Sequence, residues 1–307
     1  MKHKILYIYP SASSFVKNDI AILSKKYNII TNSYSWDKKF FVPFYLLHQF
    51  FFLIFNIRSI KNIIISFGGY WSLLPSIIGK LVNTPVFIIL NGTDCASIPS
   101  LNYGSLRKSL LRTACELSYK YASALLPVSS SLIKTKNTYY SNSKSDETNQ
   151  GYKYFFPKIS TKSIIINNGV DSAFWKRLPY IKKEPKSFIS VFSESQFVLK
   201  GGDLILKISK KFPDCSFYIV GSKQPILTEE YKNVHFLGKL SPKELKQYYN
   251  KSRFHFQLSI FEGFGMALCE AMLCECVPIG SSVNIIPDII GDTGFILTSG
   301  IYTKLKR

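Results

Sequence analysis

Acidic residues and paired cysteines are scarce in this 307-residue sequence. It has 19 Asp and Glu against 39 Lys and Arg, which gives a formal net charge of +20 and predicts an anionic partner or substrate. The six cysteines are scattered, without paired CxxC or Cys/His spacing, which argues against a metal site and favours a reducing cytoplasm. Because the basic residues follow no nucleic-acid reading motif, no nucleic-acid partner is expected.

The N-terminus lacks an apolar run long enough for the hydrophobic region of a signal peptide. A longer apolar run, residues 40–57 (FFVPFYLLHQFFFLIFNI), lies between Lys38 and Arg58. Its length is near the lower limit for a membrane-spanning helix, but His48 and Gln49 lie in its middle, where polar groups are costly in lipid. Spanning would also put the strands before and after it on opposite sides of the bilayer. A buried helix and a helix lying in the membrane interface are the alternatives.

Short β-branched runs alternate with helical patterns along the chain, which predicts an α/β fold of parallel sheets with helices on both faces. Two such sets predict two Rossmann-like domains, residues 1–170 and 171–307, with a linker over about residues 171–186. The predicted strands are residues 5–9, 28–31, 63–66, 86–90, 124–128, 163–166, 188–192, 216–220, 235–237, 254–258, 277–279 and 294–297.

The most informative stretch is residues 261–272 (FEGFGMALCEAM), in which Glu262 and Glu270 flank a glycine-containing turn that enters a helix. The turn follows a predicted strand, and ligands of open α/β sheets bind beyond the carboxyl ends of the strands. The free N–H groups and positive dipole end of a helix start suit a diphosphate. Glu262 would then face a sugar, and Glu270 would accept hydrogen bonds from ribose hydroxyls. Two Glu eight residues apart are a weak signal, but the extended string from Ser259 (S-x-F-E-G-F-G-x4-E-A-M-x5-P-I) is specific.

That string resembles the C-terminal signature of the retaining GT-B glycosyltransferases of the "group 1" family (glycosyltransferase family four). Other segments occur in the order of that family: NGTDCASIP from Asn91, NNGVD from Asn167, LKGGD from Leu199 and VHFLGKLSPKELKQYYNKS from Val234. The resemblance covers nearly the whole chain and is densest over residues 167–297.

The resemblance implies a catalytic role for two residues: Lys200 would place charge on the donor diphosphate, and Glu262 would contact the transferred sugar. The main chain of the turn from Gly263 would present N–H groups to the sugar and the phosphates. The donor-binding residues implied are Gly201, Gly221, Leu240, Gly263, Phe264, Gly265, Met266 and Glu270. The residues expected on the acceptor or sugar side are Ser14, Gly69, Asn91 and Asp94.

Some residues also have a simpler interpretation. Asn91 and Asp94 could serve only to shape a turn, and Gly69 could serve packing. His235 and His255 lie inside strand patterns and are expected in the core.

The sequence departs from the family pattern at two places. Members usually carry an Arg about five residues before the Lys, but residues 193–200 (SESQFVLK) contain none. Half of the cationic clamp on the leaving diphosphate is therefore missing or supplied elsewhere. Many members also have a His where this chain has Asn91, which can donate a hydrogen bond but cannot carry charge.

The function implied is a glycosyltransferase that moves a hexose-type sugar, with retention, from a nucleoside-diphosphate sugar to a glycan or lipid-linked acceptor in surface polysaccharide or glycoconjugate synthesis. No Asp-x-Asp motif is evident, so no metal or other cofactor is expected; a helix dipole and Lys200 would stabilise the diphosphate. The alternatives are a non-catalytic or impaired sugar-nucleotide-binding protein and a GT-B nucleotide-sugar epimerase. The predicted location is the cytoplasm, with an anionic membrane surface at the inner face of the cell membrane as a further partner to test.

The chain has only residues 298–307 after its last predicted strand. Family members continue with a crossover helix that returns to the first domain, so this helix is expected to be missing. Its absence predicts exposed apolar surface, looser domain coupling and modest stability.

Overall fold

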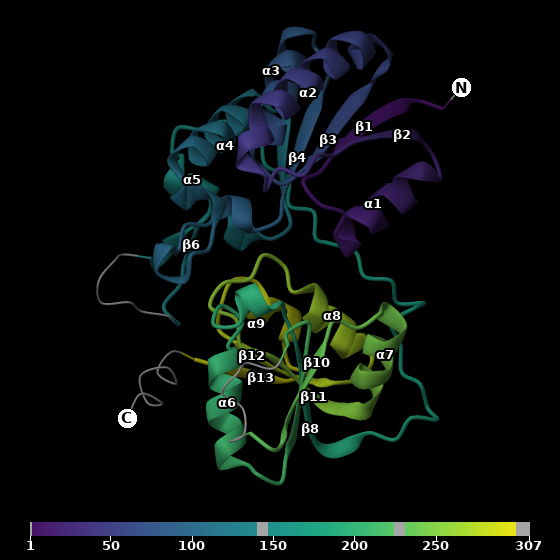
Figure 1. Ribbon diagram of the computed structural model, residues 1–307, viewed down its shortest axis with the longest axis vertical. Coiled ribbons are helices and arrows are strands. Elements are labelled where there is room, and N and C mark those ends of the chain that lie inside the picture. Colours follow the sequence, from purple (N-terminus) through teal and green to yellow (C-terminus); the bar gives the residue numbers. More distant parts are fainter. Residues whose placement is uncertain (1, 140–146, 224–230, 299–307) are drawn as a thin grey trace. The chain divides into compact units, whose positions relative to one another are not determined.

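The computed structural model describes residues 2–139, 147–223 and 231–298 (Figure 1). Within them, residues 2–136 and 147–169 form a first compact unit, and residues 137–139 and 170–298 form a second. The predicted first domain included residues 137–139, and the structure corrects this. The side chain of Tyr139 is 3% exposed and packs with Leu268 and Ile286 of the second unit.

The first unit is built on a 5-stranded parallel sheet in the order β2-β1-β3-β4-β5. These strands are β1 (Lys4–Ile8), β2 (Asn28–Asn32), β3 (Asn62–Ser66), β4 (Val86–Leu90) and β5 (Ala124–Pro127). The remaining elements are the helices α1 (Ser14–Ser24), α2 (Val42–Asn56), α3 (Tyr70–Leu81), α4 (Ser109–Tyr121) and α5 (Tyr152–Phe155), and the hairpin β6 (Thr135–Lys136) and β7 (Asn149–Gln150). Helix α3 packs between α2 and α4 (Figure 1).

The second unit is built on a 6-stranded parallel sheet in the order β10-β9-β8-β11-β12-β13. Its strands are β8 (Glu184–Val191), β9 (Ser216–Val220), β10 (Val234–Gly238), β11 (Ser252–Gln257), β12 (Val277–Ser281) and β13 (Phe295–Leu297). Its helices are α6 (Gly202–Lys211), α7 (Pro242–Lys251), α8 (Met266–Leu273) and α9 (Ile286–Ile290).

Successive residues of the second sheet point to opposite faces, and both faces are covered. Ile189 and Tyr218 belong to the core cluster that contains Tyr249 of α7. Their neighbours Phe188 and Phe217 pack in the cluster of α6. Parallel strands buried on both faces favour nearly continuous apolar runs, as in β9 (SFYIV), whereas β11 (SRFHFQ) alternates polar and apolar residues. The predicted α/β class with helices on both faces is therefore confirmed.

One predicted strand, residues 163–166, forms only an isolated bridge to β5. The segment runs beside β5, where the N–H groups of Ile164 and Ile166 donate to the carbonyls of Leu125 and Pro127. Pro127 has no N–H to return a hydrogen bond, so the ladder stops there. The other predicted strands are present; the largest shift is at β8, which begins at Glu184 instead of Phe188.

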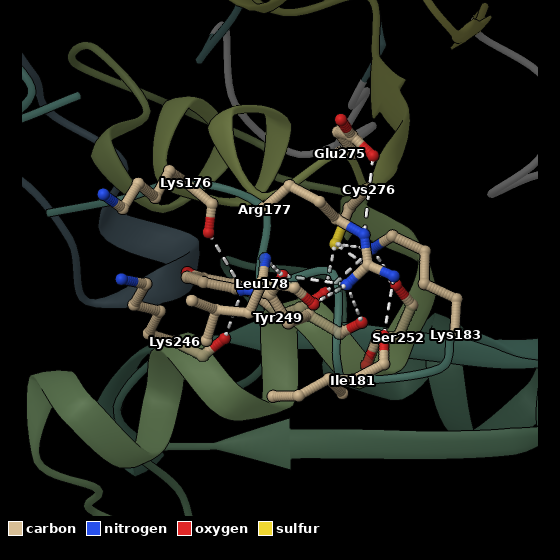
Figure 2. Close-up of polar contacts among 11 residues, drawn as sticks. Lys176, Arg177, Leu178, Ile181, Lys183, Lys246, Tyr249, Ser252, Glu275 and Cys276 are labelled. Atoms are coloured by element: carbon tan, nitrogen blue, oxygen red, sulfur yellow. Dashed lines mark hydrogen bonds and ion pairs between the residues drawn. The ribbon is translucent and has the colours of Figure 1, made fainter. Parts of the chain in front are cut away.

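A polar cluster fixes the predicted linker, residues 171–186, to the second unit (Figure 2). Arg177 donates to Asn250 Oδ1 at 3.0 Å, and Lys183 Nζ donates to the Ser252 carbonyl at 2.8 Å. Both cations converge on the C-terminal end of α7, where they oppose the negative end of the helix dipole. The segment before β8 is thus held by specific bonds and is not a free tether.

Most of the apolar run of residues 40–57 forms α2 (Val42–Asn56), and within this helix only Gln49 and Leu53 are buried. Of the two alternatives to a spanning helix, the buried helix therefore does not describe α2. In the described parts of the chain, no helix combines the length and the apolar character needed to cross a bilayer.

Candidate active site

The strand order of the second sheet reverses between β8 and β11. Open α/β sheets bind ligands beyond the carboxyl ends of their strands at such a switch point. Lys200 lies after β8, and Glu262 lies after β11. The two predicted catalytic residues therefore come from the two strands that flank the switch point.

Lys200 and Glu262 form a largely buried ion pair. Lys200 Nζ lies 2.6 Å from Glu262 Oε2, and the two side chains are 15% and 11% exposed. The same oxygen accepts hydrogen bonds from Gln257 Nε2 at 2.5 Å and from Ser259 Oγ at 3.0 Å. A buried pair is tolerated when such bonds offset the cost of desolvation. The pair also explains why a cation is stable beside the positive N-terminal end of α6.

The loop that carries Lys200 is fixed against the end of β11. The Ile260 N–H donates to the Leu199 carbonyl at 2.7 Å. Gly201 has φ 76°, and a Cβ on it would lie 2.6 Å from the Leu258 carbonyl oxygen. Only glycine fits this conformation and this close approach. Gly201 therefore positions Lys200, and its contact with a donor stays a prediction.

Three residues that the sequence analysis did not assign to the site support Glu262. His255, Gln257 and Ser259 alternate along β11 and its extension, so their side chains share one face. His255 Nε2 lies 3.1 Å from Gln257 Oε1, and Gln257 Nε2 donates to Ser259 Oγ at 2.9 Å. Polar residues at every second position of a buried strand were the signal for this network. His255 is buried as predicted, whereas His235 is exposed and stacks on Tyr218.

We expect His255 to destabilise the protein in acid. Burial lowers the pKa of His255 from 6.5 to about 4. The unfolded chain takes up this proton near pH 6.5, whereas the folded chain takes it up only near pH 4, so stability is lost as the pH falls through this window. Each pKa unit corresponds to about 1.4 kcal/mol, so acid should lower the free energy of unfolding of the unmodified protein by about 3 kcal/mol through this residue. His255→Gln should not show this decrease. Urea unfolding of both proteins at pH 7.5 and 4.5 measures this difference; equal losses in the two proteins would contradict it.

Main-chain and side-chain bonds also hold the loop that carries Glu262. The Glu262 N–H donates to Asn284 Oδ1 at 3.1 Å. Asn137 Nδ2 donates to the Ile260 carbonyl at 2.5 Å. Asn137 was missed because it lies far from this loop in the sequence and only the fold brings it there.

Glu270 lies on α8, which starts directly after the glycine turn. Gly265 caps this helix with φ 98°, a conformation that favours glycine, and Gly263, Phe264 and Met266 complete the turn. Burial raises the pKa of Glu270 from 4.5 to about 7, and the nearby Tyr249 hydroxyl opposes part of that rise. A buried, perturbed carboxyl group beside a candidate site is typical of a functional residue.

Gly221 and Leu240 follow β9 and β10, at the same edge of the sheet as Lys200. Gly221 has φ 92°, and its N–H donates to the Gly238 carbonyl at 2.6 Å. Leu240 packs on the core cluster of Tyr218 and Tyr249. The structure therefore gives both residues a packing role, and their predicted place near the nucleotide stays untested.

The predicted acceptor-side residues belong to the first unit, and Asp94 has a clear structural role there. Its carboxylate is fully buried and accepts hydrogen bonds from the N–H groups of Gly68 at 2.8 Å, Asn91 at 3.1 Å and Gly92 at 3.0 Å. Burial raises the pKa of Asp94 to about 6, and these N–H groups oppose the rise. Asp94 thus joins the loops that follow β3 and β4, which agrees with the turn interpretation.

The other first-unit candidates differ in their surroundings. Asn91 Nδ2 donates to Ser66 Oγ at 3.2 Å. A Cβ on Gly69 would lie 2.5 Å from the Trp71 ring, so packing requires this glycine. Ser14 is exposed at the start of α1. A role of these residues toward an acceptor stays a prediction.

Among the residues that the structure describes, no second cation joins the hydrogen bonds of the Lys200–Glu262 pair in place of the missing Arg. Arg177 is bound at the end of α7, beside the start of β11, and so at the opposite edge of the sheet from Lys200. Among the described residues, no group of three or more His, Cys, Asp or Glu side chains could hold a metal ion.

Comparison with known proteins finds a family similarity in the second unit. Residues 177–306 match the family described as "Glycosyl transferases group 1", so the second unit is similar to proteins of that family. A probable sucrose-phosphate synthase of Thermosipho melanesiensis is 30% identical over 207 residues, which are 61% of this chain and 46% of that protein. The O-antigen chain mannosyltransferase B of Escherichia coli is 32% identical over 63 residues, 20% of this chain and 16% of that protein. The chain thus covers less than half the length of these relatives.

Solved structures confirm the predicted GT-B fold class. Sucrose-phosphate synthase of Thermosynechococcus elongatus has a TM-score of 0.70 at 12% identity, over 99% of this chain and 88% of that one. The catalytic domain of starch synthase IV of Arabidopsis thaliana, bound to ADP and acarbose, has a TM-score of 0.66 at 12% identity, over 100% of this chain and 91% of that one. At these identities the likeness establishes the fold alone.

Proposed function

We propose that the protein is a glycosyltransferase that takes a hexose-type sugar from a nucleoside-diphosphate sugar and transfers it with retention. The observation that carries this proposal is the buried Lys200–Glu262 pair at the switch point of a unit similar to group 1 glycosyl transferases. A cation and a hydrogen-bonded carboxylate at this place can bind a diphosphate and a sugar hydroxyl side by side.

The donor would bind with its diphosphate at the start of α8. The main-chain N–H groups of the turn from Gly263 to Met266 and the Lys200 ammonium would neutralise the phosphates. Glu270 would accept hydrogen bonds from the ribose. Gln257, Ser259 and Lys200 all reach the same oxygen of Glu262, so Oε1 would be the atom that accepts from the sugar.

The chemistry would then be mainly stabilisation of the leaving group. The bond between the anomeric carbon and the diphosphate oxygen breaks, and its electron pair leaves with the diphosphate. The acceptor oxygen attacks the same face of the sugar, and its proton passes to a departing phosphate oxygen. Lys200 and the helix dipole stabilise the charge that develops there.

The activities named for the relatives support a sugar or glycan acceptor without specifying one for this chain. We infer an acceptor that belongs to a surface polysaccharide or glycoconjugate, glycan or lipid-linked, and a cytoplasmic location. Because the Arg is missing, one alternative function stays open: a protein that binds the donor sugar nucleotide without transferring its sugar.

A panel of nucleoside-diphosphate sugars tests the proposal. A donor that binds the folded state should raise the melting temperature. Sugar released or transferred from that donor, measured with glycan and lipid-linked acceptors, separates an enzyme from a binding protein. If no donor of the panel shifts the melting temperature, the proposed function is wrong.

We expect transfer to be independent of divalent metal, because Lys200 and the start of α8 would supply the positive charge. Transfer rates measured in EDTA and after addition of Mg²⁺ or Mn²⁺ should agree within about twofold. Loss of transfer in EDTA and recovery with either metal would contradict this account.

A further inference from the structure

Helix α2 exposes a continuous apolar face. Phe44, Leu47, Phe51, Ile54 and Phe55 recur at helical spacing and are 61%, 56%, 50%, 49% and 80% exposed. Phe50 is 40% exposed, and Phe40 and Phe41, directly before the helix, are 81% and 45% exposed. Scattered apolar residues are common on a protein surface, but a stripe of large ones along one helix indicates an interaction site.

The buried side of the same helix is polar at its centre, which is the reverse of an ordinary surface helix. Gln49 is fully buried and donates to Asn32 Oδ1 and to the Trp71 carbonyl, each at 3.1 Å. These bonds fix the rotation of α2 about its axis. The apolar face therefore cannot turn inward without breaking both bonds and leaving Asn32 Oδ1 and the Trp71 carbonyl without this donor.

The charged residues from Lys38 through α2 to Lys80 are all basic, and Asp37 directly precedes them. From Lys38 to Thr93 the sequence contains no Asp or Glu. Arg58 and Lys61 are exposed just beyond the helix and line a hollow of about 370 Å³ together with the loop from Val82 to Pro85. Leu81 and Val82, 76% and 48% exposed, extend the apolar surface beside this hollow.

We propose that α2 is a membrane-docking helix that lies in the interface of an anionic bilayer. Its phenylalanine and leucine side chains would enter the acyl region, and the hollow of Arg58 and Lys61 would take up lipid phosphate. An amphipathic helix of this kind binds through buried apolar area and through attraction to anionic lipid. The helix has 15 residues and would lie along the surface. This inference is independent of the proposed transfer reaction.

Vesicle sedimentation of the full chain tests it. We expect binding to phosphatidylcholine vesicles with about 30% phosphatidylglycerol and at least about tenfold weaker binding of Phe51→Ser/Phe55→Ser. Arg58→Gln/Lys61→Gln should weaken binding to anionic vesicles and leave the weak binding to pure phosphatidylcholine unchanged. Phe212→Ser is the matched control, because Phe212 is 55% exposed on the second unit and should bind like the unmodified protein.

A depth measurement distinguishes insertion from surface attraction. Tryptophan placed by Phe51→Trp should be quenched by lipids brominated on the acyl chain, and tryptophan placed by Phe212→Trp should not. Equal binding of Phe51→Ser/Phe55→Ser and the unmodified protein would overturn the proposal. A second result would also overturn it: the unmodified protein self-associates in light scattering, Phe51→Ser/Phe55→Ser makes it monomeric, and neither protein binds vesicles.

Discussion

Replacing Lys200 by Met is expected to lower sugar transfer at least about tenfold, a loss of about 1.4 kcal/mol of transition-state stabilisation. Its ammonium group is the one cation in the hydrogen-bond network of Glu262 among the described residues. Removing it takes charge from the proposed diphosphate site and also leaves the Glu262 carboxylate buried with neutral donors only. Breaking a buried pair from one side costs about 3 kcal/mol, so stability should fall as well.

The double variant Lys200→Met/Glu262→Gln separates the two effects. Without the carboxylate, no unpaired charge remains, so we expect the double variant to recover most of the stability that Lys200→Met loses. Transfer should stay at least as low as in the single variant, because the catalytic charge is still absent. Urea unfolding and initial rates of all four proteins complete the cycle. Recovery of transfer together with stability would show that the pair serves the fold alone.

Replacing Glu270 by Gln is expected to stabilise the protein above neutral pH while weakening donor binding about tenfold. Burial raises the pKa of Glu270 from 4.5 to about 7 in the folded state. Below pH 4.5 the carboxyl group is protonated in both states and costs nothing. As the pH rises from 4.5 to 7, the folded state loses stability, and the loss of about 3 kcal/mol is complete above pH 7. Gln carries no such cost, but it is a weaker acceptor for ribose hydroxyls than a carboxylate.

Unfolding of both proteins at pH 4.5 and pH 8 measures the stability change, and titration with the donor found in the panel measures the binding change. The stability difference should be present at pH 8 and absent at pH 4.5. Asp203→Asn, on α6, is a control acid that carries no expected loss of donor binding. If Glu270→Gln is no more stable at pH 8, or binds the donor normally, Glu270 is an ordinary helix residue.

The sequence by itself determined the alternation of strands and helices, because runs buried on both faces must be apolar whatever their neighbours are. It also pointed to Glu262 and Glu270, because a glycine turn after a strand can be recognised from consecutive residues, and the family resemblance added Lys200. The glycines support this reading: Gly201 and Gly265 both have positive φ.

Tertiary structure alone decided the contacts between distant segments. Asn137 reaches the Ile260 carbonyl across 123 residues of sequence. No local sequence pattern predicts such a hydrogen bond, because in another fold either group could form its hydrogen bond with water instead. In the same way, Pro127 ended the ladder of residues 163–166 only because that segment pairs beside β5.

The sequence also could not predict which face of α2 packs against the rest of the protein. An apolar stretch of 15 residues is compatible with a core helix, a spanning helix or an interfacial helix, since hydropathy does not say which side meets the sheet. The bonds of Gln49 to Asn32 and Trp71 decide it, by turning the polar residue inward and the phenylalanines outward. Burial of one amide in a tertiary hydrogen-bond network thus sets which surface this protein presents.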